Sequence, residues 1–295
     1  FFQRPQWDKF KGADNTFASD ALNPDGRRVQ ISSTHDLGTN FAKAFDVKFM
    51  DTDGKEKLAH QTCFGPGIWR IIASLIAVHG DDQGLVLPFD AAPIQIVIVP
   101  ITFTGKDADN RKVLEACEDL EADLKGLGYQ VHLDDRDGMT PGEKYNIWEM
   151  KGVPLRLEIG PREAAAQTAT VVRRTERKRE QIETKKGLLL KEIQTQASLL
   201  DMAIKSRAEA YFKEKTKDAG TLADLKKILE KHPGFVKVPY CSMTMDGQAC
   251  AGKIKEETTA QVCGTLLNEE KPKKGMVCAA CGKDAKHVTY VAKSV

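Results

Sequence analysis

The chain lacks the long apolar run that a membrane-spanning helix needs. Its longest apolar stretches, Ile71–Val78 and Ile94–Ile101, fall well short of the roughly 18–20 residues required. Net charge is almost absent, because 44 Lys and Arg residues against 42 Asp and Glu residues leave only +2. This balance excludes a generally basic nucleic-acid coat and permits only a local basic patch. No secretory pattern opens the chain. It begins with Phe1 in place of Met, which indicates an internal or processed segment.

What is present is the composition of a folded protein. Hydrophobic residues make up 41% and charged residues 29% of 295 residues, a length that favours two or three domains. Residues 1–90 predict a mixed block with a largely buried helix at 68–78, because apolar residues recur there at helical spacing. The strands expected in this block lie at residues 28–32, 45–50 and 84–88.

A different pattern follows the Ala91–Pro93 linker. Strands rich in Ile and Val alternate with a helix over residues 113–127, which is typical of a compact α/β domain. The strands are expected at residues 94–101, 129–133, 153–159 and 168–172. Residues 173–191 hold eight basic and three acidic side chains, so they form either a solvated helix face or a contact with a nucleic-acid backbone.

The seven cysteines are unevenly placed, and five of them follow residue 240. An odd number fits a fully paired disulfide framework poorly, so the clustering favours a metal site in a reducing compartment. Cys278 and Cys281 form a C-x-x-C pair, and Cys241 and Cys250 are the best second pair for a tetrahedral structural Zn²⁺. Cys263 is the spare. A redox pair remains the alternative for C-x-x-C, and His287 could replace one ligand.

Gly65 and Gly67 precede Arg70 at the start of the predicted helix. Glycine lets a ligand approach the backbone closely, and an arginine at this position can bind a polyphosphate in a bidentate manner. On pattern alone, a turn followed by a surface arginine explains these residues equally well.

Longer stretches around this turn carry a family resemblance. The glycine–arginine turn with its apolar helix resembles motif 3 of a class II aminoacyl-tRNA synthetase, and residues 30–45 resemble the amino-acid loop of prolyl-tRNA synthetases. Residues 134–163, above all the run WEMKGVPLRLEIGPRE at 148–163, are similar to the anticodon domain of that family. The cysteine-rich end points to the archaeal and eukaryotic type.

The resemblance implies a multidomain α+β and α/β protein. Residues 1–90 would form the C-terminal part of the class II antiparallel-sheet catalytic core, with motifs 1 and 2 upstream of Phe1. Residues 93–195 would form the α/β anticodon-binding domain, and residues 196–295 a small α/β zinc-binding domain with leading helices.

The implied activity is that of a proline–tRNA ligase, which uses ATP with Mg²⁺ to make prolyl-adenylate and then transfers proline to tRNA(Pro). The resemblance further implies a homodimer and a cytoplasmic location without membrane attachment. The alternatives are a non-catalytic, zinc-stabilised tRNA-binding module of the same ancestry and another class II synthetase, such as the threonyl, histidyl or glycyl enzyme.

Individual site residues follow from the same resemblance. Arg70 would act on ATP, and His35 would line the pocket with it as the second catalytic residue. The other residues implied to bind ATP or proline are Phe10, Gln30, Ser33, Gly65 and Gly67. Without the resemblance, His35 and Phe10 would be taken as ordinary core residues.

Glu149, Arg156 and Arg162 match family positions that read the anticodon. Proline anticodons carry two guanines, whose N1–H and N2–H groups can donate to a carboxylate and whose O6 and N7 atoms can accept from arginine. A salt-bridge network at a sheet edge is the alternative for these three residues.

Overall fold

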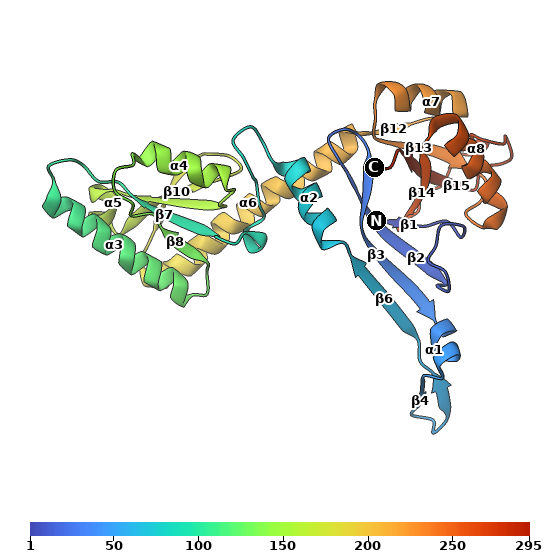
Figure 1. Ribbon diagram of the computed structural model, residues 1–295, viewed down its shortest axis with the longest axis horizontal. Helices are drawn as coiled ribbons and strands as arrows, with labels where there is room; N and C mark the ends of the chain where they lie inside the picture. Colours follow the sequence, from blue (N-terminus) through green and yellow to red (C-terminus); the bar gives the residue numbers. More distant parts are fainter. The chain divides into compact units, whose positions relative to one another are not determined.

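The computed structural model describes residues 1–295. They form two compact units, one made of residues 1–78 and 211–295 and the other of residues 79–210 (Figure 1). None of the helices combines the length and the apolarity that a bilayer crossing requires.

The first unit is built on an eight-stranded sheet that combines the beginning and the end of the chain. β1 (Phe2–Gln3) pairs with β2 (Asn15–Leu22) on one side and with β14 (Gln261–Leu266) on the other. The strand order is β12-β13-β15-β14-β1-β2-β3-β6, antiparallel except between β12 and β13. The remaining strands are β3 (Arg28–Gly38), β6 (Gln61–Pro66), β12 (Thr216–Asp218), β13 (Phe235–Tyr240) and β15 (His287–Ala292).

Two apolar clusters hold this sheet. In the C-terminal part, α7 (Leu222–Lys231) and α8 (Gln248–Thr258) pack Leu225 and Ile254 against β13. A second cluster joins Phe2 of β1 to Phe235 and Tyr290, with ring centroids 5.4 and 5.1 Å apart. The short β1 is therefore fixed by aromatic packing as well as by its ladder hydrogen bonds.

Smaller elements complete the first unit. α1 (Asn40–Phe45) follows β3, and the hairpin of β4 (Lys48–Met50) and β5 (Glu56–Leu58) leads to β6. α2 (Ile68–His79) begins directly after β6, and a short 3-10 turn, η2 (Met245–Gly247), precedes α8.

The second unit contains a five-stranded sheet in the order β11-β10-β9-β7-β8. β7 (Ile96–Pro100) lies parallel to β8 (Val131–Leu133) and to β9 (Leu155–Ile159). β10 (Thr168–Arg173) and β11 (Arg179–Glu183) extend the sheet in antiparallel fashion. The helices are α3 (Asp107–Gly126), α4 (Pro141–Met150), α5 (Pro161–Ala166) and α6 (Lys186–Glu214), preceded by the 3-10 turn η1 (Phe89–Ala91).

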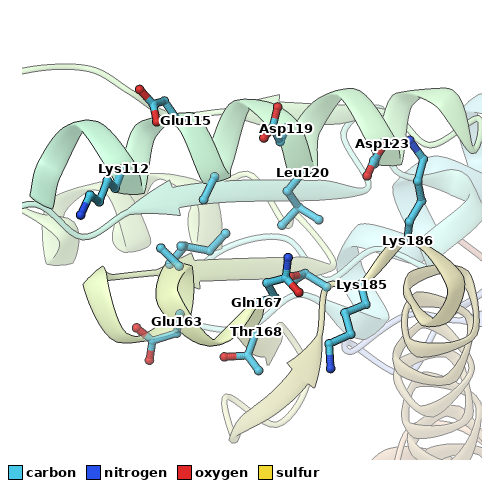
Figure 2. Close-up of a pocket in the computed structure, with 14 residues that line it drawn as sticks. Lys112, Glu115, Asp119, Leu120, Asp123, Glu163, Gln167, Thr168, Lys185 and Lys186 are labelled. Carbon is cyan, nitrogen blue, oxygen red and sulfur yellow. Dashed lines mark ion pairs between the residues drawn. The ribbon is translucent and has the colours of Figure 1, made fainter.

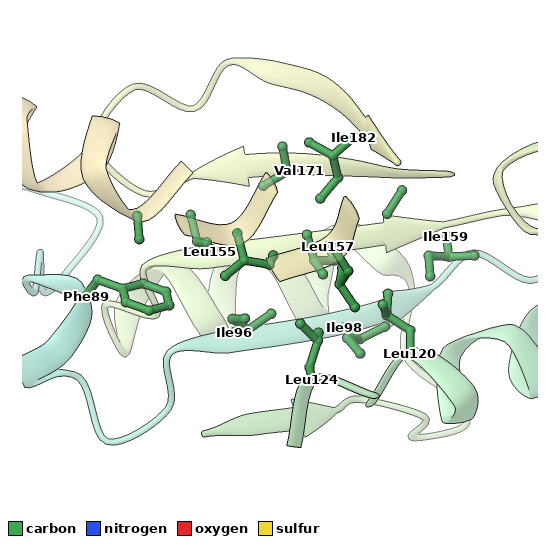
Figure 3. Packing of buried hydrophobic residues seen from close by; sticks show 14 of the residues in the cluster. Phe89, Ile96, Ile98, Leu120, Leu124, Leu155, Leu157, Ile159, Val171 and Ile182 are labelled. Atoms are coloured by element: carbon green, nitrogen blue, oxygen red, sulfur yellow. The ribbon is translucent and has the colours of Figure 1, made fainter. Parts of the chain in front are cut away.

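The two faces of this sheet are covered differently. Ile96, Ile98, Leu155 and Leu157 are buried in one cluster with residues of α3 and α6 (Figure 3). Val97 and Val99 point to the other face, where Trp148 of α4 packs on them. A strand buried on both faces explains the continuous apolar run at its position.

Most expectations for this unit are confirmed. β7, β8, β9 and β10 lie within or around the predicted ranges, and α3 contains the predicted helix. The predicted limit at 195/196 falls inside α6, which is continuous from Lys186 to Glu214. The division into three domains stays a prediction.

Three expectations about local structure were wrong. Residues 84–88 form no strand, because Gly84 closes a turn onto Asp81. Residues 45–50 do not form one strand, because Asp46 adopts a left-handed conformation with φ 55° that ends α1 before β4 begins. Residues 173–191 are not a helix face; they form a turn, β11 and the start of α6.

The helix predicted at 68–78 is present, but its expected burial is wrong. Trp69 is 83% exposed, and Ile68, Ile72 and Ile76 are also exposed. Only Ser74 and the terminal His79 are buried along α2. The apolar spacing correctly indicated a helix with an apolar face, yet no segment of the first unit packs over that face.

Candidate functional site

His35 lies at the centre of a polar and aromatic constellation on β3. Its Nδ1 atom is 3.0 Å from the Thr16 hydroxyl of β2, and its Nε2 atom is 3.0 Å from the Ser33 hydroxyl. The Phe10 ring lies over the imidazole, with centroids 4.7 Å apart, and is 46% exposed. Burial lowers the pKa of His35 below its usual 6.5, so the imidazole is neutral at pH 7.

The register between β3 and β6 brings the glycine turn to the same place. Ser33 lies opposite Gly65, and a Cβ atom at Gly65 would come within 3.3 Å of the Ser33 Oγ atom. A Cβ atom at Gly67 would approach the carbonyl oxygen of Ile31 to 3.1 Å. Because neither glycine has a side chain, the space beside Ser33 stays open.

Arg70 lies on the first turn of α2 and is exposed. Its Nη1 atom donates to the backbone oxygen of Gln30 at 3.2 Å, so the guanidinium stays beside β3. The Gln30 side chain accepts from Arg4 at 2.9 Å. Gln30 and Arg70 both line an open cleft of about 410 Å³, which leaves the remaining Arg70 donors available to an anionic ligand.

All seven residues predicted for ATP and proline lie in the first unit, on or beside β3, β6 and the start of α2. Sequence reasoning missed Thr16, which binds His35, and Arg4, which orients Gln30. Neither position carries a local signal, because both act through strands that pair across the sheet.

The residues predicted to read an anticodon lie in the second unit. Arg156 on β9 donates from Nη1 to Glu149 of α4 at 2.8 Å and from Nε to Glu158 at 3.0 Å. Its guanidinium also lies 4.0 Å from the centre of the Tyr145 ring. Arg156 is thus held in place by two carboxylates and one aromatic ring, which matches the salt-bridge alternative as well as a preformed recognition group.

Arg162 is exposed and lies apart from that pair. It lines a cleft of about 470 Å³ at the carboxyl ends of β7 and β9, together with Glu158 and Arg179. Glu158 connects the two places, because it accepts from Arg156 and lies 3.2 Å from the Arg179 guanidinium. The network therefore reaches an open surface of the molecule, although Arg156 itself is buried.

A separate cleft of about 430 Å³ lies between α3 and the segment after α5 (Figure 2). Glu115 and Asp119 line it from α3, and an ion pair between Lys186 and Asp123 at 2.9 Å lies at one end. None of the predicted site residues lines this cleft.

The structure brings Cys241, Cys250, Cys278 and Cys281 together. Their sulfur atoms all lie within 4.8 Å of one another, and those of Cys241 and Cys250 are 3.7 Å apart. A tetrahedral ion with Zn–S bonds of about 2.3 Å needs sulfur atoms about 3.8 Å apart, so the four thiols fit such an ion. They are too far apart to be disulfides, whose S–S bond is about 2.05 Å.

The four thiols differ in their local environment. A hydrogen bond from the backbone N–H of Lys283 lowers the pKa of Cys281 to about 7, whereas burial raises that of Cys241 to about 11. Metal binding would deprotonate all of them. The spare Cys263 is buried in the aromatic cluster of Phe2 and Tyr290, and His287 contacts Glu269, so neither belongs to the group.

Comparison with known proteins places both units in one family. Residues 95–196 match the family model for an anticodon binding domain, and residues 222–294 match the model described as prolyl-tRNA synthetase, C-terminal. The proline–tRNA ligase of Thermofilum pendens is 47% identical over all 295 residues, and that of Ignicoccus hospitalis is 42% identical over 292 residues.

These matches cover 100% and 99% of this chain, and 59% of each relative. The chain thus spans about three-fifths of the length of the curated relatives. A solved structure of Giardia lamblia prolyl-tRNA synthetase in complex with prolyl-adenylate is 30% identical, with a TM-score of 0.87 over 100% of this chain and 61% of that one. The chain therefore belongs to the prolyl-tRNA synthetase family and corresponds to the C-terminal portion of its members.

Proposed function

We propose that this chain is the part of a proline–tRNA ligase that carries motif 3, anticodon recognition and a structural zinc site. The similarity over the entire chain to proline–tRNA ligases is the observation that carries the proposal. The juxtaposition of His35, Ser33 and Gly65 beside Arg70 gives it a chemical basis.

The first unit would bind ATP and proline. In the activation step the proline carboxylate attacks the α-phosphorus of ATP, and pyrophosphate leaves. ATP would enter with Mg²⁺, which neutralises phosphate charge. Arg70 would stabilise the charge that develops on the phosphates, and the groups flanking it need only position the reactants.

The remaining residues of this unit would shape the pocket. A neutral His35, held between Thr16 and Ser33, offers a fixed polar group without a competing positive charge. The exposed Phe10 ring offers an apolar surface suited to the pyrrolidine ring. Gly65 and Gly67 would leave room for the adenylate, and Gln30 would lie near the nucleotide.

The second unit would bind the anticodon of tRNA(Pro) through Glu149, Arg156 and Arg162. A carboxylate and two guanidinium groups supply the acceptors and donors that guanine edges require. The ion pair between Glu149 and Arg156 orients both groups before RNA binds, and an incoming base would exchange for part of that pair.

The four-cysteine group would hold one Zn²⁺ that stabilises the C-terminal part of the first unit and performs no chemistry. A homodimer stays a prediction from the family resemblance.

ATP–pyrophosphate exchange on the longest native chain tests the proposal. Exchange that depends on proline alone supports it. Binding of tRNA(Pro) without exchange would indicate the non-catalytic module, and exchange with another amino acid would indicate a different synthetase.

The variant Arg70→Ala tests the role assigned to Arg70 in the same assay. The substitution should abolish adenylate formation and leave tRNA affinity nearly unchanged, because Arg70 lies in the first unit and the anticodon residues in the second. An equal loss of both would contradict its role. Lys226→Ala, which changes an exposed basic residue on α7 of the same unit, is the matched control.

A further inference from the structure

The loop between β7 and α3 presents an exposed aromatic side chain to the cleft that Arg162 lines. Phe103 is 50% exposed, although the strand directly before it is fully buried. Phe103, Lys106, Arg162 and Arg179 all line this cleft of about 470 Å³. The core of the sheet is complete without Phe103, so packing does not account for its position.

The loop is held in place by a two-point clamp. The Asn110 side chain accepts from the backbone N–H of Phe103 at 3.0 Å and donates to the backbone oxygen of the same residue at 2.8 Å. Asn110 itself lies on α3. The backbone that carries the aromatic ring is therefore fixed in advance, which lowers the entropic cost of binding.

Two of the positively charged side chains around the Phe103 ring have no ion-pair partner. Glu158 is already paired with Arg156 and Arg179, and Glu163 accepts from the backbone N–H of Gly160 at 3.1 Å. Lys106 and Arg162 make no ion pair, and the Lys106 ammonium lies 5.8 Å from the centre of the Phe103 ring. An open aromatic ring beside unpaired cations is the arrangement that binds an unpaired nucleotide.

We propose that this cleft is a subsite for one nucleotide that flanks the anticodon triplet, with its base stacked on Phe103 and its phosphate bound by Lys106 and Arg162. The subsite rests on the proposed function, because it adjoins the network of Glu149, Arg156 and Glu158. It adds a contact that is independent of base identity, since every base offers a face for stacking.

Equilibrium binding of the full chain to the anticodon stem-loop of tRNA(Pro) tests the subsite. Phe103→Ala should weaken binding about tenfold or more, and Phe103→Trp should restore it, because indole also stacks. Phe49→Ala is the matched control, since Phe49 is 47% exposed and lies in the first unit. Lys106→Ala should reduce the slope of log affinity against log salt by about 0.7, whereas Phe103→Ala should leave it unchanged.

Stem-loops with a single abasic nucleotide identify the partner of the ring. One flanking abasic substitution should weaken binding to the unmutated protein and have no further effect on Phe103→Ala. If Phe103→Ala binds like the unmutated protein while Glu149→Ala loses anticodon preference, the subsite is wrong and the proposed function stands. If the unmutated protein binds a stem-loop with a changed anticodon equally well, anticodon reading fails and the subsite with it.

Discussion

At the scale of single residues, His35 shows how burial sets a protonation state. Its two nitrogens contact the hydroxyls of Thr16 and Ser33, and its folded-state pKa lies below 6.5 because burial penalises the charged form. Below pH 6.5 the unfolded chain therefore binds a proton that the folded chain resists. Stability from this residue is complete above that pH and is lost as the pH falls through the folded-state pKa.

His35→Gln should consequently flatten the pH dependence of the free energy of unfolding below pH 6.5. It should also cost about 1–3 kcal/mol at pH 7.5, because the packing under Phe10 changes and a hydrogen bond is lost. Urea denaturation at several pH values measures both effects. Part of the pH dependence should remain in this variant, because burial and Arg207 also lower the pKa of His79. An unchanged slope in His35→Gln, with the exposed His60→Gln as control, would contradict this account.

The sequence could indicate site residues only where a motif names them. Ser33, His35, Gly65 and Arg70 follow from a family resemblance, and β3 with β6 brings them together. The groups that hold them could not be predicted, because Thr16 on β2 and Arg4, which follows β1, meet their partners only through the register of the sheet. The C-x-x-C pair was the exception, since its spacing alone indicated two side chains that could bind one metal ion.

At the scale of elements, the turn from Cys278 to Cys281 places two of the four clustered thiols. The backbone N–H of Cys278 donates to the oxygen of Lys283 at 2.7 Å, and that of Gly282 donates to the oxygen of Cys278 at 2.9 Å. These bonds present both sulfurs on the same side. A bound ion would give the buried thiols of Cys250 and Cys278 a ligation partner.

Cys281→Ser should therefore lower the zinc content well below one ion per chain and lower the melting temperature. Elemental analysis and thermal unfolding measure the two effects, and a chelator should reproduce the second. Cys63→Ser is the matched control, because Cys63 is also exposed but lies on β6 outside the group. Full metal content in Cys281→Ser would show that another residue completes the site.

Side-chain hydrogen bonds hold α4 at both of its ends. Thr140 accepts from the backbone N–H of Glu143 at 3.4 Å, and Glu143 accepts from that of Thr140 at 2.7 Å. At the other end, Trp148 donates to Asp134 at 2.7 Å. Burial raises the pKa of Asp134, but hydrogen bonds from Arg136 and Trp148 outweigh it and lower the pKa to about 2.

Thr140→Ala should destabilise the second unit by about 1 kcal/mol, because it removes the N-cap acceptor of α4. Thr140→Ser should retain most of the stability, since a serine hydroxyl caps equally well. Chemical denaturation of the two variants checks the difference. Equal stability in both would mean that packing alone holds α4.

The elements also show where sequence patterns have their limits. Helical spacing correctly indicated α2 and α3, and apolar runs correctly indicated β7 and β9. The burial of α2 could not be judged, because spacing reveals an apolar face and not what covers it. The helix face expected in the basic segment 173–191 was wrong, because a turn and β11 occupy most of it, and Arg173 and Arg174 are paired with Glu180 and Asp81. Contact of this segment with a nucleic-acid backbone stays a prediction.

At the scale of the whole molecule, a buried ion network joins distant parts of the first unit. Asp20 on β2 accepts from Arg4 at 2.6 Å and from Arg28 at 3.1 Å, and its side chain is fully buried. Arg4 also donates to the backbone oxygen of Cys263, and Arg28 to Gln261, on β14. One carboxylate therefore balances two guanidinium groups where the N-terminal strands of the unit meet β14.

Asp20→Ala should destabilise the first unit by about 3–5 kcal/mol, because it leaves two buried cations without their partner. Asp20→Asn should also be destabilising, since it keeps the shape and removes the charge. Asp25→Ala is the control, because the Asp25 side chain is 58% exposed and should contribute little. If denaturation gave Asp20→Ala and Asp25→Ala equal stability, the network would have no structural role.

The pairing of β1 with β14 has a consequence for biosynthesis. Strands β1, β2 and β3 leave the ribosome before β14, and the nascent chain must grow to β14 before β1 gains its second neighbour. At ordinary translation rates that delay is on the order of ten to fifty seconds. During that delay, the backbone edge of β1 and the aromatic ring of Phe2 lack their partners from the C-terminal strands, whereas residues 79–210 contain every strand of their own sheet.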